Sequence, residues 1–429
     1  MGQHSAHIQS LLDRIADILA RGEQPPSALL HELTHRWKEE RPDDIDGLGA
    51  LLVALRANVN HDTLAEAKRR IERARLKSTL DVHEWRQSAA TRSALHLPPT
   101  TDQQAGWLYP VFFGTTRAPS NEYSLSDRFG VQRGQEVIFG RCTVWVPATH
   151  LFATTGTPWW QRWLRLQLAD DHLQLHDITT FTAEGLWEAV RTEMGKAHQP
   201  HGLVYLHGYH VTFEDAAIRA AQMGFDLKVN GATAFFSWPS KGSLTGYAAD
   251  AASLEASEDA IAHFLMDFVH RSGAQVVHII AHSMGNRGLL RALQRLMRDG
   301  DLASDITFGQ IFLAAPDVDR DVFLNHANLF PRFSTRTTLY ASDADHALAT
   351  SAWLYENSRA GYCPPVTVPR LARFDTVRVP RFNLDLLGHS YYAEAGALLY
   401  DMSVLMSHDT PPAQRPAVLP VEDYWVMQS

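Results

Sequence analysis

Apolar residues recur with two different periods along the chain. In the first hundred residues they are spaced by three or four positions, as in Ile8, Leu11, Ile15 and Leu19. Positions with that spacing share one face of an α-helix, so the pattern predicts helices. Further stretches of this kind cover residues 29–37, 48–55 and 62–86. We therefore expect a helical domain at residues 1–100.

The pattern changes after Leu97-Pro98-Pro99, which is typical of a linker. Short apolar runs now alternate with stretches of helical spacing. Strands are expected at 108–113, 137–146, 203–207, 232–238, 275–281, 306–313, 337–341 and 374–379, and helices at 214–223, 253–270, 285–298 and 346–355. This alternation predicts an α/β fold, with a mostly parallel sheet and helices on both faces. We assign this domain to residues 101–410 and expect the Pro-rich segment 411–429 to be an irregular tail.

Composition narrows the class of protein. The net charge of −9, from 39 basic and 48 acidic residues, argues against nucleic acid as a partner because its phosphates are negative. The two cysteines, Cys142 and Cys363, are too few for a disulfide scaffold and fit a reducing compartment, so we expect a cytoplasmic protein. No apolar run approaches the roughly 18 residues of a membrane-spanning helix. No signal-peptide pattern is visible either.

The strongest local signal is a buried strand that runs directly into a helix, with Ala281-His282-Ser283-Met284-Gly285 at the turn. A nucleophile elbow needs this strand–turn–helix context, with small residues on either side of the serine. Ala281 stands where such turns usually carry glycine. The alternative is that Ser283 only caps the helix. We expect Ser283 to be a nucleophile because partners for it follow in the required chain order.

A serine hydroxyl needs a base, and the base needs an acid to orient it. In the order Ser, Asp, His, the expected base is His389, although a histidine packed in the core is the alternative. The expected acid is Asp345, which follows the strand at 337–341. Asp317, which follows the preceding strand, is its main rival, and Asp343 lies two residues away from Asp345.

A second turn supplies candidate donors for an oxyanion. The strand at 203–207 ends in His207-Gly208 before a helix, and hydrolases of this architecture take one backbone N–H from that loop and one from the residue after the nucleophile. We therefore expect the N–H groups of Tyr209 and Met284 to form an oxyanion hole. The alternative is an ordinary Gly-containing turn. His210 and Trp238 are the expected substrate contacts, and no metal site is expected at these histidines because no carboxylate or cysteine partner is near them.

These segments, taken together, resemble a poorly characterised bacterial α/β-hydrolase family of the esterase/lipase superfamily. The resemblance covers about residues 108–406 and is carried by segments that keep their order, namely 113–117 (FGTTR), 207–214 (HGYHVTFE), 236–240 (FSWPS), 281–287 (AHSMGNR), 314–319 (AAPDVD) and 388–392 (GHSYY). It implies hydrolase chemistry with Ser283 as the nucleophile and His389 as the base. The family pattern around the acid is present at 340–348 (YASDADHAL) and favours Asp345.

A competing motif lies in the helical region. His31-Glu32-Leu33-Thr34-His35 satisfies H-E-x-x-H, in which two histidines share a helix face and bind zinc while the glutamate acts as base. No third ligand is evident downstream, and Arg36-Trp37-Lys38 follows in place of a Gly-x-x-His extension. We therefore expect a surface helix here and not a metallopeptidase.

The sequence predicts a serine hydrolase that cleaves carboxylic esters through an acyl-enzyme, with no metal and no diffusible cofactor. An amidase, thioesterase or acyltransferase on the same site is the nearest alternative. A non-enzymatic interaction protein, with the helical region as its working part, is the other. The expected partner is a small-molecule ester, and the N-terminal helices are the expected surface for any homo-oligomer.

Overall fold

The computed structural model falls into two units, Met1–Gln103 and Gln104–Ser429. It describes Leu29 and Glu32 of the first unit, and residues 106–120, 125, 127–147, 150, 173–241, 247–298, 305–342, 359–362, 371–379 and 392–427 of the second. The helices predicted at 1–100 lie outside the described residues, except that Leu29 is helical and buried and Glu32 is helical and exposed.

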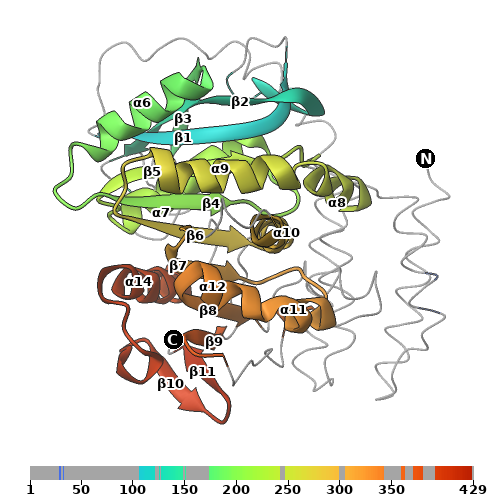
Figure 1. Ribbon diagram of the computed structural model, residues 1–429, viewed down its shortest axis with the longest axis vertical. Coiled ribbons are helices and arrows are strands. Elements are labelled where there is room, and N and C mark those ends of the chain that lie inside the picture. Colours follow the sequence, from blue (N-terminus) through green and yellow to red (C-terminus); the bar gives the residue numbers. More distant parts are fainter. Residues whose placement is uncertain are drawn as a thin grey trace, which may run out of the picture. The chain divides into compact units, whose positions relative to one another are not determined.

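A single mixed sheet organises the second unit (Figure 1). Its described strands run in the order β10-β11-β9-β8-β7-β6-β4-β5-β1-β2-β3. The central strands, from β9 to β1 in this order, are all parallel to one another. They are β1 (Gly106–Pro119), β5 (Gly231–Ser237), β4 (His201–Leu206), β6 (Val276–His282), β7 (Phe308–Ala314), β8 (Ser334–Ser342) and β9 (Phe374–Val379). The predicted α/β fold is confirmed.

Both ends of the sheet are antiparallel. β2 (Phe129–Pro147) and β3 (Gln174–Phe181) extend one end. At the other end β10 (Val418–Val421) pairs with β11 (Tyr424–Met427), which lies parallel to β9. The expectation of an irregular tail at 411–429 is therefore wrong for these two strands. The four prolines between residues 411 and 420 favoured an irregular tail, but apolar residues of this segment continue the sheet, among them the buried Val418 and Met427.

Helices cover both faces of the sheet, and the core divides accordingly. One face packs against α6 (Ala183–Met194), α8 (Tyr247–Glu255), α9 (Glu258–Arg271), α10 (Gly285–Arg298), α11 (Arg320–His326) and α12 (Phe330–Phe333). The other packs against α7 (Phe213–Asp226) and α14 (Tyr392–His408). Figure 1 shows α9, α10 and α12 on the near side of the sheet. None of the described helices is long and apolar enough to cross a membrane.

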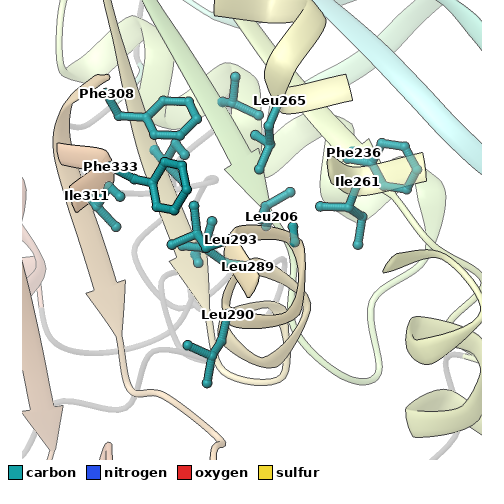
Figure 2. Packing of buried hydrophobic residues seen from close by; sticks show 14 of the residues in the cluster. Leu206, Phe236, Ile261, Leu265, Leu289, Leu290, Leu293, Phe308, Ile311 and Phe333 are labelled. Atoms are coloured by element: carbon teal, nitrogen blue, oxygen red, sulfur yellow. The ribbon is translucent and has the colours of Figure 1, made fainter. Parts of the chain in front are cut away.

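The two faces follow from the alternation of side chains along each strand. In β4, Val204 and Leu206 belong to the first core cluster, and Leu203 and Tyr205 belong to the second. Strands buried on both faces read as continuous apolar runs, which is why the sequence revealed them. Figure 2 shows part of the first cluster, where leucines of α10 lie close to Leu206.

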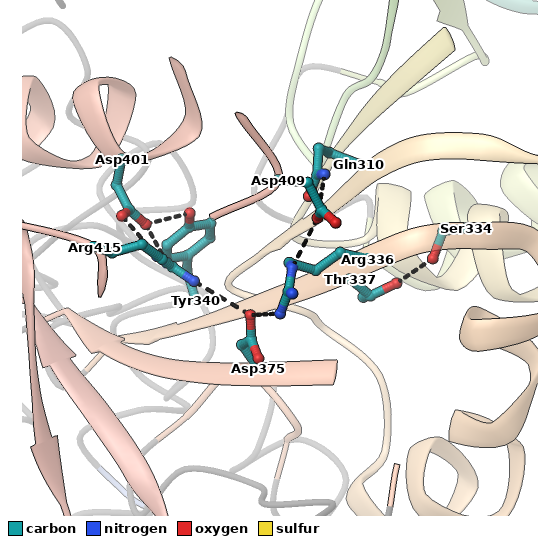
Figure 3. Close-up of polar contacts among 9 residues, drawn as sticks. All are labelled: Gln310, Ser334, Arg336, Thr337, Tyr340, Asp375, Asp401, Asp409 and Arg415. Carbon is teal, nitrogen blue, oxygen red and sulfur yellow. Dashed lines mark hydrogen bonds and ion pairs between the residues drawn. The ribbon is translucent and has the colours of Figure 1, made fainter. Parts of the chain in front are cut away.

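A buried polar network ties the C-terminal segments to the sheet (Figure 3). Asp401 of α14 accepts hydrogen bonds from the Tyr340 hydroxyl at 2.7 Å and from Arg415 Nε at 2.9 Å. Asp375 of β9 lies between Arg415 and Arg336, at 3.4 and 2.9 Å. Burial raises the pKa of Asp375, and the charge of Arg336 counters part of that shift. The charges inside this network are thus matched by neighbours of opposite sign.

We predict that Arg336→Gln lowers the free energy of unfolding by roughly 3 kcal/mol, because it leaves the carboxylate of Asp375 buried with fewer donors. Arg336 also pairs with Asp409 at 2.9 Å, so two carboxylates lose a partner. Urea denaturation at pH 7 measures the change. Arg291→Gln, at a half-exposed surface arginine, is the matched control and should alter stability by less than about 0.5 kcal/mol. Equal effects of the two substitutions would contradict the prediction.

Candidate active site

The candidate site lies at the topological switch point of the sheet, between β4 and β6. From β4 the chain adds β5 on one side, and from β6 it adds β7, β8 and β9 on the other. In open α/β sheets, ligands bind at the carboxyl ends of the strands beside such a switch point. Ser283 follows β6 and the loop 207–212 follows β4, the strand paired with β6. Two predicted site segments therefore meet at this edge of the sheet.

Ser283 occupies a strained turn between β6 and α10. Its φ is 49°, in the left-handed region that a non-glycine residue adopts only where the surroundings enforce it. The Ser283 N–H donates to the carbonyl of Ala314 at 2.9 Å. The Ser283 carbonyl accepts from the N–H groups of Asn286 and Asp317, each at 3.1 Å. The backbone of the turn is thus held on both sides, and the side chain stands at the sheet edge.

Asn286 also stabilises this turn, through contacts of its side-chain amide with backbone carbonyls. Its buried amide nitrogen lies 3.0 Å from the carbonyl of Ala281, 3.1 Å from that of Ser283 and 3.2 Å from that of Ala314. Gly285 lets α10 begin directly against β4, because a Cβ there would meet the carbonyl oxygens of Leu206 and His207 at 2.5 Å. The first N–H groups of a helix lack intrahelical partners, so the N-terminus of α10 favours negative charge near Ser283.

The loop 207–212 packs directly against the serine. A Cβ on Gly208 would lie 2.9 Å from the Cβ of Ser283 and 3.0 Å from Nδ1 of His282, so only glycine fits. Tyr209 is half-buried, and its ring centroid lies 5.3 Å from that of Tyr247. His210 is exposed and has a φ of 59°. The loop therefore turns sharply beside Ser283 before Thr212 caps α7.

Trp238 lies behind this loop. Its fully buried ring stacks on His207 with centroids 4.8 Å apart, and its Nε1 donates to the His207 carbonyl at 3.3 Å. These contacts support the loop from inside the protein. A substrate-binding role for Trp238 stays a prediction, as it does for His210, whose exposed ring is the more accessible of the two.

Two described histidines close to Ser283, His207 and His282, are poor bases. Burial lowers the pKa of His207 to about 3, and the positive charge of Arg117 acts in the same direction. Burial likewise lowers the pKa of His282 to about 3, with a smaller contribution from Arg219. A general base works best with a pKa near the operating pH. His207 and His282 are therefore poor candidates for a general base at neutral pH.

Asp317 lies close to the elbow, but its carboxylate is engaged. It accepts a hydrogen bond from the Tyr247 hydroxyl at 2.5 Å, and it forms ion pairs with Arg359 at 3.3 Å and Arg287 at 4.0 Å. The side chain is buried. These contacts give Asp317 a structural task, in which it joins the end of β7 to α8, α10 and the segment around Arg359.

The predicted base His389 and the predicted acid Asp345, with its neighbour Asp343, lie outside the described residues. Their flanking elements are described. β8 ends at Ser342, shortly before Asp345, and α14 begins at Tyr392, shortly after His389. Because β6, β8 and β9 are parallel, the ends of β8 and β9 lie at the same edge of the sheet as Ser283.

The described residues contain no group of three or more side chains suited to a metal ion. Of the H-E-x-x-H motif, only Glu32 is described among the three candidate zinc-site residues, and it is exposed. The expectation that this motif holds no zinc therefore stays a prediction.

The model of a family described as "Alpha/beta hydrolase of unknown function (DUF900)" matches residues 183–407. The chain belongs to this family. The match includes Ser283, the loop 207–212, and the segments of Asp345 and His389, so this α/β-hydrolase carries its candidate site within the family region. The resemblance inferred from the sequence motifs is confirmed.

A solved structure similar to this α/β-hydrolase comes from a study of two fungal esterases from Rhizomucor miehei. It is 10% identical, with a TM-score of 0.31, over 77% of this chain and 94% of that chain. No protein with a curated description matches the sequence.

Sequence reasoning missed the residues that hold the site together. Arg117, Ser237 and Asp250 are buried polar residues behind the loop, and Asn286 is buried under the elbow. Arg117, Ser237 and Asn286 belong to motifs that carry the family resemblance, and that membership was the only hint in the sequence that they matter for the site. Their partners lie on other strands and helices, so the motifs alone gave no role for them.

We predict that stability falls in acid because three histidines are buried uncharged. Burial lowers the pKa of His207, His278 and His282 to about 3, against an ordinary value of 6.5. Between these values the unfolded chain binds more protons than the folded protein, so stability decreases as pH falls from about 6.5 towards 3. Each such histidine lowers the free energy of unfolding by about 2 kcal/mol between pH 7 and pH 5.

His278 allows a clean measurement, since Nδ1 accepts the Gln310 N–H at 3.0 Å and an asparagine oxygen can replace that acceptor. Between pH 7 and pH 5, the free energy of unfolding of His278→Asn should therefore fall by about 2 kcal/mol less than that of the wild type, as measured by urea denaturation. Carboxyls with raised pKa, such as Asp250 and Asp375, act in the opposite direction but are common to both proteins. Identical losses in the two proteins would refute the assignment.

Proposed function

We propose that the protein hydrolyses carboxylic esters through an acyl-enzyme formed on Ser283. The observation that carries the proposal is the strained turn of Ser283, with Gly208 packed against its Cβ. Strain of this kind at a non-glycine residue is maintained where the placement of one side chain matters. Membership in an α/β-hydrolase family supports the same chemistry.

In the proposed mechanism, Ser283 Oγ attacks the ester carbonyl carbon while its proton passes to His389. The carbonyl oxygen becomes an oxyanion, which accepts hydrogen bonds from the N–H groups of Tyr209 and Met284. Each such donor stabilises the transition state by about 3 kcal/mol. His389 then returns the proton to the departing alkoxide. In the second half, water attacks the acyl-enzyme, its proton passes through His389 to Ser283, and the carboxylic acid leaves.

Asp345 is the proposed partner of His389. It follows β8, whose end lies at the edge of the sheet that carries Ser283. Asp317 serves this role less well because Arg287, Arg359 and Tyr247 already occupy its carboxylate. The low pKa values of His207 and His282 favour a base from a different segment, which is the role proposed for His389.

Amides, thioesters and acyl transfer to an alcohol would use the same steps with a different leaving group or acceptor. The acyl-enzyme is common to all of them. A small-molecule ester as substrate, a cytoplasmic location and homo-oligomers formed through the N-terminal helices stay predictions from the sequence.

A fluorophosphonate probe tests the nucleophile. Wild-type protein should form a covalent adduct on Ser283, identified by peptide mass spectrometry, because the probe needs an activated serine. Ser283→Ala should not be labelled, and His389→Ala should lose reactivity by roughly 10⁴-fold. Ser334→Ala, at a buried serine that begins β8 and has no part in the loop 207–212, is the control and should keep Ser283 labelled. An unlabelled but folded wild type would overturn the proposed function and favour the interaction-protein alternative.

The choice of acid is tested with a paired substitution. Asp345→Asn should lower kcat for a nitrophenyl ester by roughly 10³- to 10⁴-fold with little change in stability, because the imidazole loses its orienting partner. Asp317→Asn should instead lower the free energy of unfolding by roughly 3 kcal/mol, because two arginines lose a buried counter-charge. The reverse outcome, with catalysis lost only in Asp317→Asn, would make Asp317 the acid.

A further inference from the structure

Arg117 is a buried cation close to the candidate site that the proposed mechanism does not use. It lies near the end of β1, where the pairing with β2 shifts register on both sides of it. Its side chain is among the largest fully buried ones, at 1% exposure. Burial lowers its pKa to about 10, and the charges of Asp250 and Asp215 counter part of that shift. Burial of a guanidinium costs free energy, so its contacts need an explanation.

The guanidinium of Arg117 contacts three other segments of the chain: β2, the loop 207–212 and residues 237–240 at the end of β5. Nε donates to Ser237 Oγ at 2.8 Å, at the end of β5. Nη1 donates to the carbonyl of Gly130 at 3.2 Å and to that of Ser240 at 3.1 Å. Nη2 donates to the carbonyl of Val211 at 2.8 Å. A planar fork of fixed donors suits this task, because it holds several acceptors in one geometry.

Two of these contacts lead to the loop beside Ser283. Val211 is itself in the loop, and its N–H donates to Ser240 Oγ at 3.2 Å, so both its backbone groups are held. Ser237 Oγ lies 3.3 Å from Nε2 of His207, at the start of the loop. Arg117 is thus tied to the loop on both sides of Tyr209.

Asp250 of α8 completes the support. Its carboxylate accepts from Ser240 Oγ at 2.6 Å, from the Lys241 N–H at 2.8 Å and from the N–H of His210. The loop backbone is therefore held at His210 and Val211, while Gly208 rests on Ser283. Between these fixed points the backbone of Tyr209 has little freedom.

We infer that Arg117 is a positioning residue that holds the loop 207–212 so that the Tyr209 N–H faces the oxyanion formed at Ser283. The inference rests on the proposed function. It gives a task to Phe113-Gly114-Thr115-Thr116-Arg117, a motif that lies outside the region matched by the family model. Since the oxyanion exists only during reaction, loss of the positioning should reduce kcat and leave KM nearly unchanged.

The test compares Arg117→Gln with Arg336→Gln, a buried arginine at the opposite, amino-terminal part of β8. We measure the rate constant for fluorophosphonate labelling of Ser283, and kcat and KM for nitrophenyl acetate, at a temperature where circular dichroism shows both variants folded. Arg117→Gln should reduce labelling and kcat by about 10- to 100-fold, with KM within about threefold. Arg336→Gln should keep labelling within about twofold of wild type despite its lower stability.

Labelling of folded Arg117→Gln at the wild-type rate would overturn the inference, as would an equal loss in Arg336→Gln or a change confined to KM. If Arg117→Gln does not fold, Arg117→Lys decides, since lysine keeps the charge but lacks the fork. A folded Arg117→Lys with reduced labelling supports the inference, and one with wild-type labelling overturns it. Wild-type protein that is not labelled at all rejects the proposed function, and this inference with it.

Discussion

The arrangement of the site depends on the close approach of α10 to the end of β4. No side chain fits at Gly285, where a Cβ would meet the carbonyl oxygens of Leu206 and His207 at 2.5 Å. That contact brings the helix N-terminus, the elbow and the loop 207–212 into one place. It also requires a left-handed backbone at Ser283, which the hydrogen bonds to Ala314, Asn286 and Asp317 maintain. Strain at one residue is thus sustained by ordinary contacts around it.

Polar residues divide into two buried groups that serve different ends of the sheet. Behind the loop, Arg117, Asp250 and Ser240 bind backbone groups and fix the course of the chain. Under α14, Arg415 and Asp401 bind each other and secure a helix to the strands. A fully satisfied polar network specifies one arrangement of the segments that it joins, where apolar packing alone tolerates several. The apolar clusters on the two faces supply the driving force, and these networks supply the geometry.

The sequence predicted the central strands because strands buried on both faces, such as 276–282, are continuous apolar runs. Of the described helices it predicted α7 and α10, merged α8 and α9 into one at 253–270, and missed α6, α11, α12 and α14. The helix expected at 346–355 lies outside the described residues. The sequence pattern also missed β3, whose residues 174–181 are largely polar at the sheet edge, and β10 and β11, which are short. For the site, local spacing was enough to predict the turn at Ser283. The support from Arg117 and Asn286 depends on partners that are distant in sequence, and spacing carries no information about such contacts.

The position of Arg415 has a consequence for biosynthesis. Arg415, the ion-pair partner of Asp401 and a second one for Asp375, follows both carboxylates in the chain. Until the segment from Arg415 to β11 has left the ribosome, α14 lacks its ion pair and β9 has an uncovered edge. Until that pairing forms, the unpaired edge of β9 is open to aggregation and to chaperones.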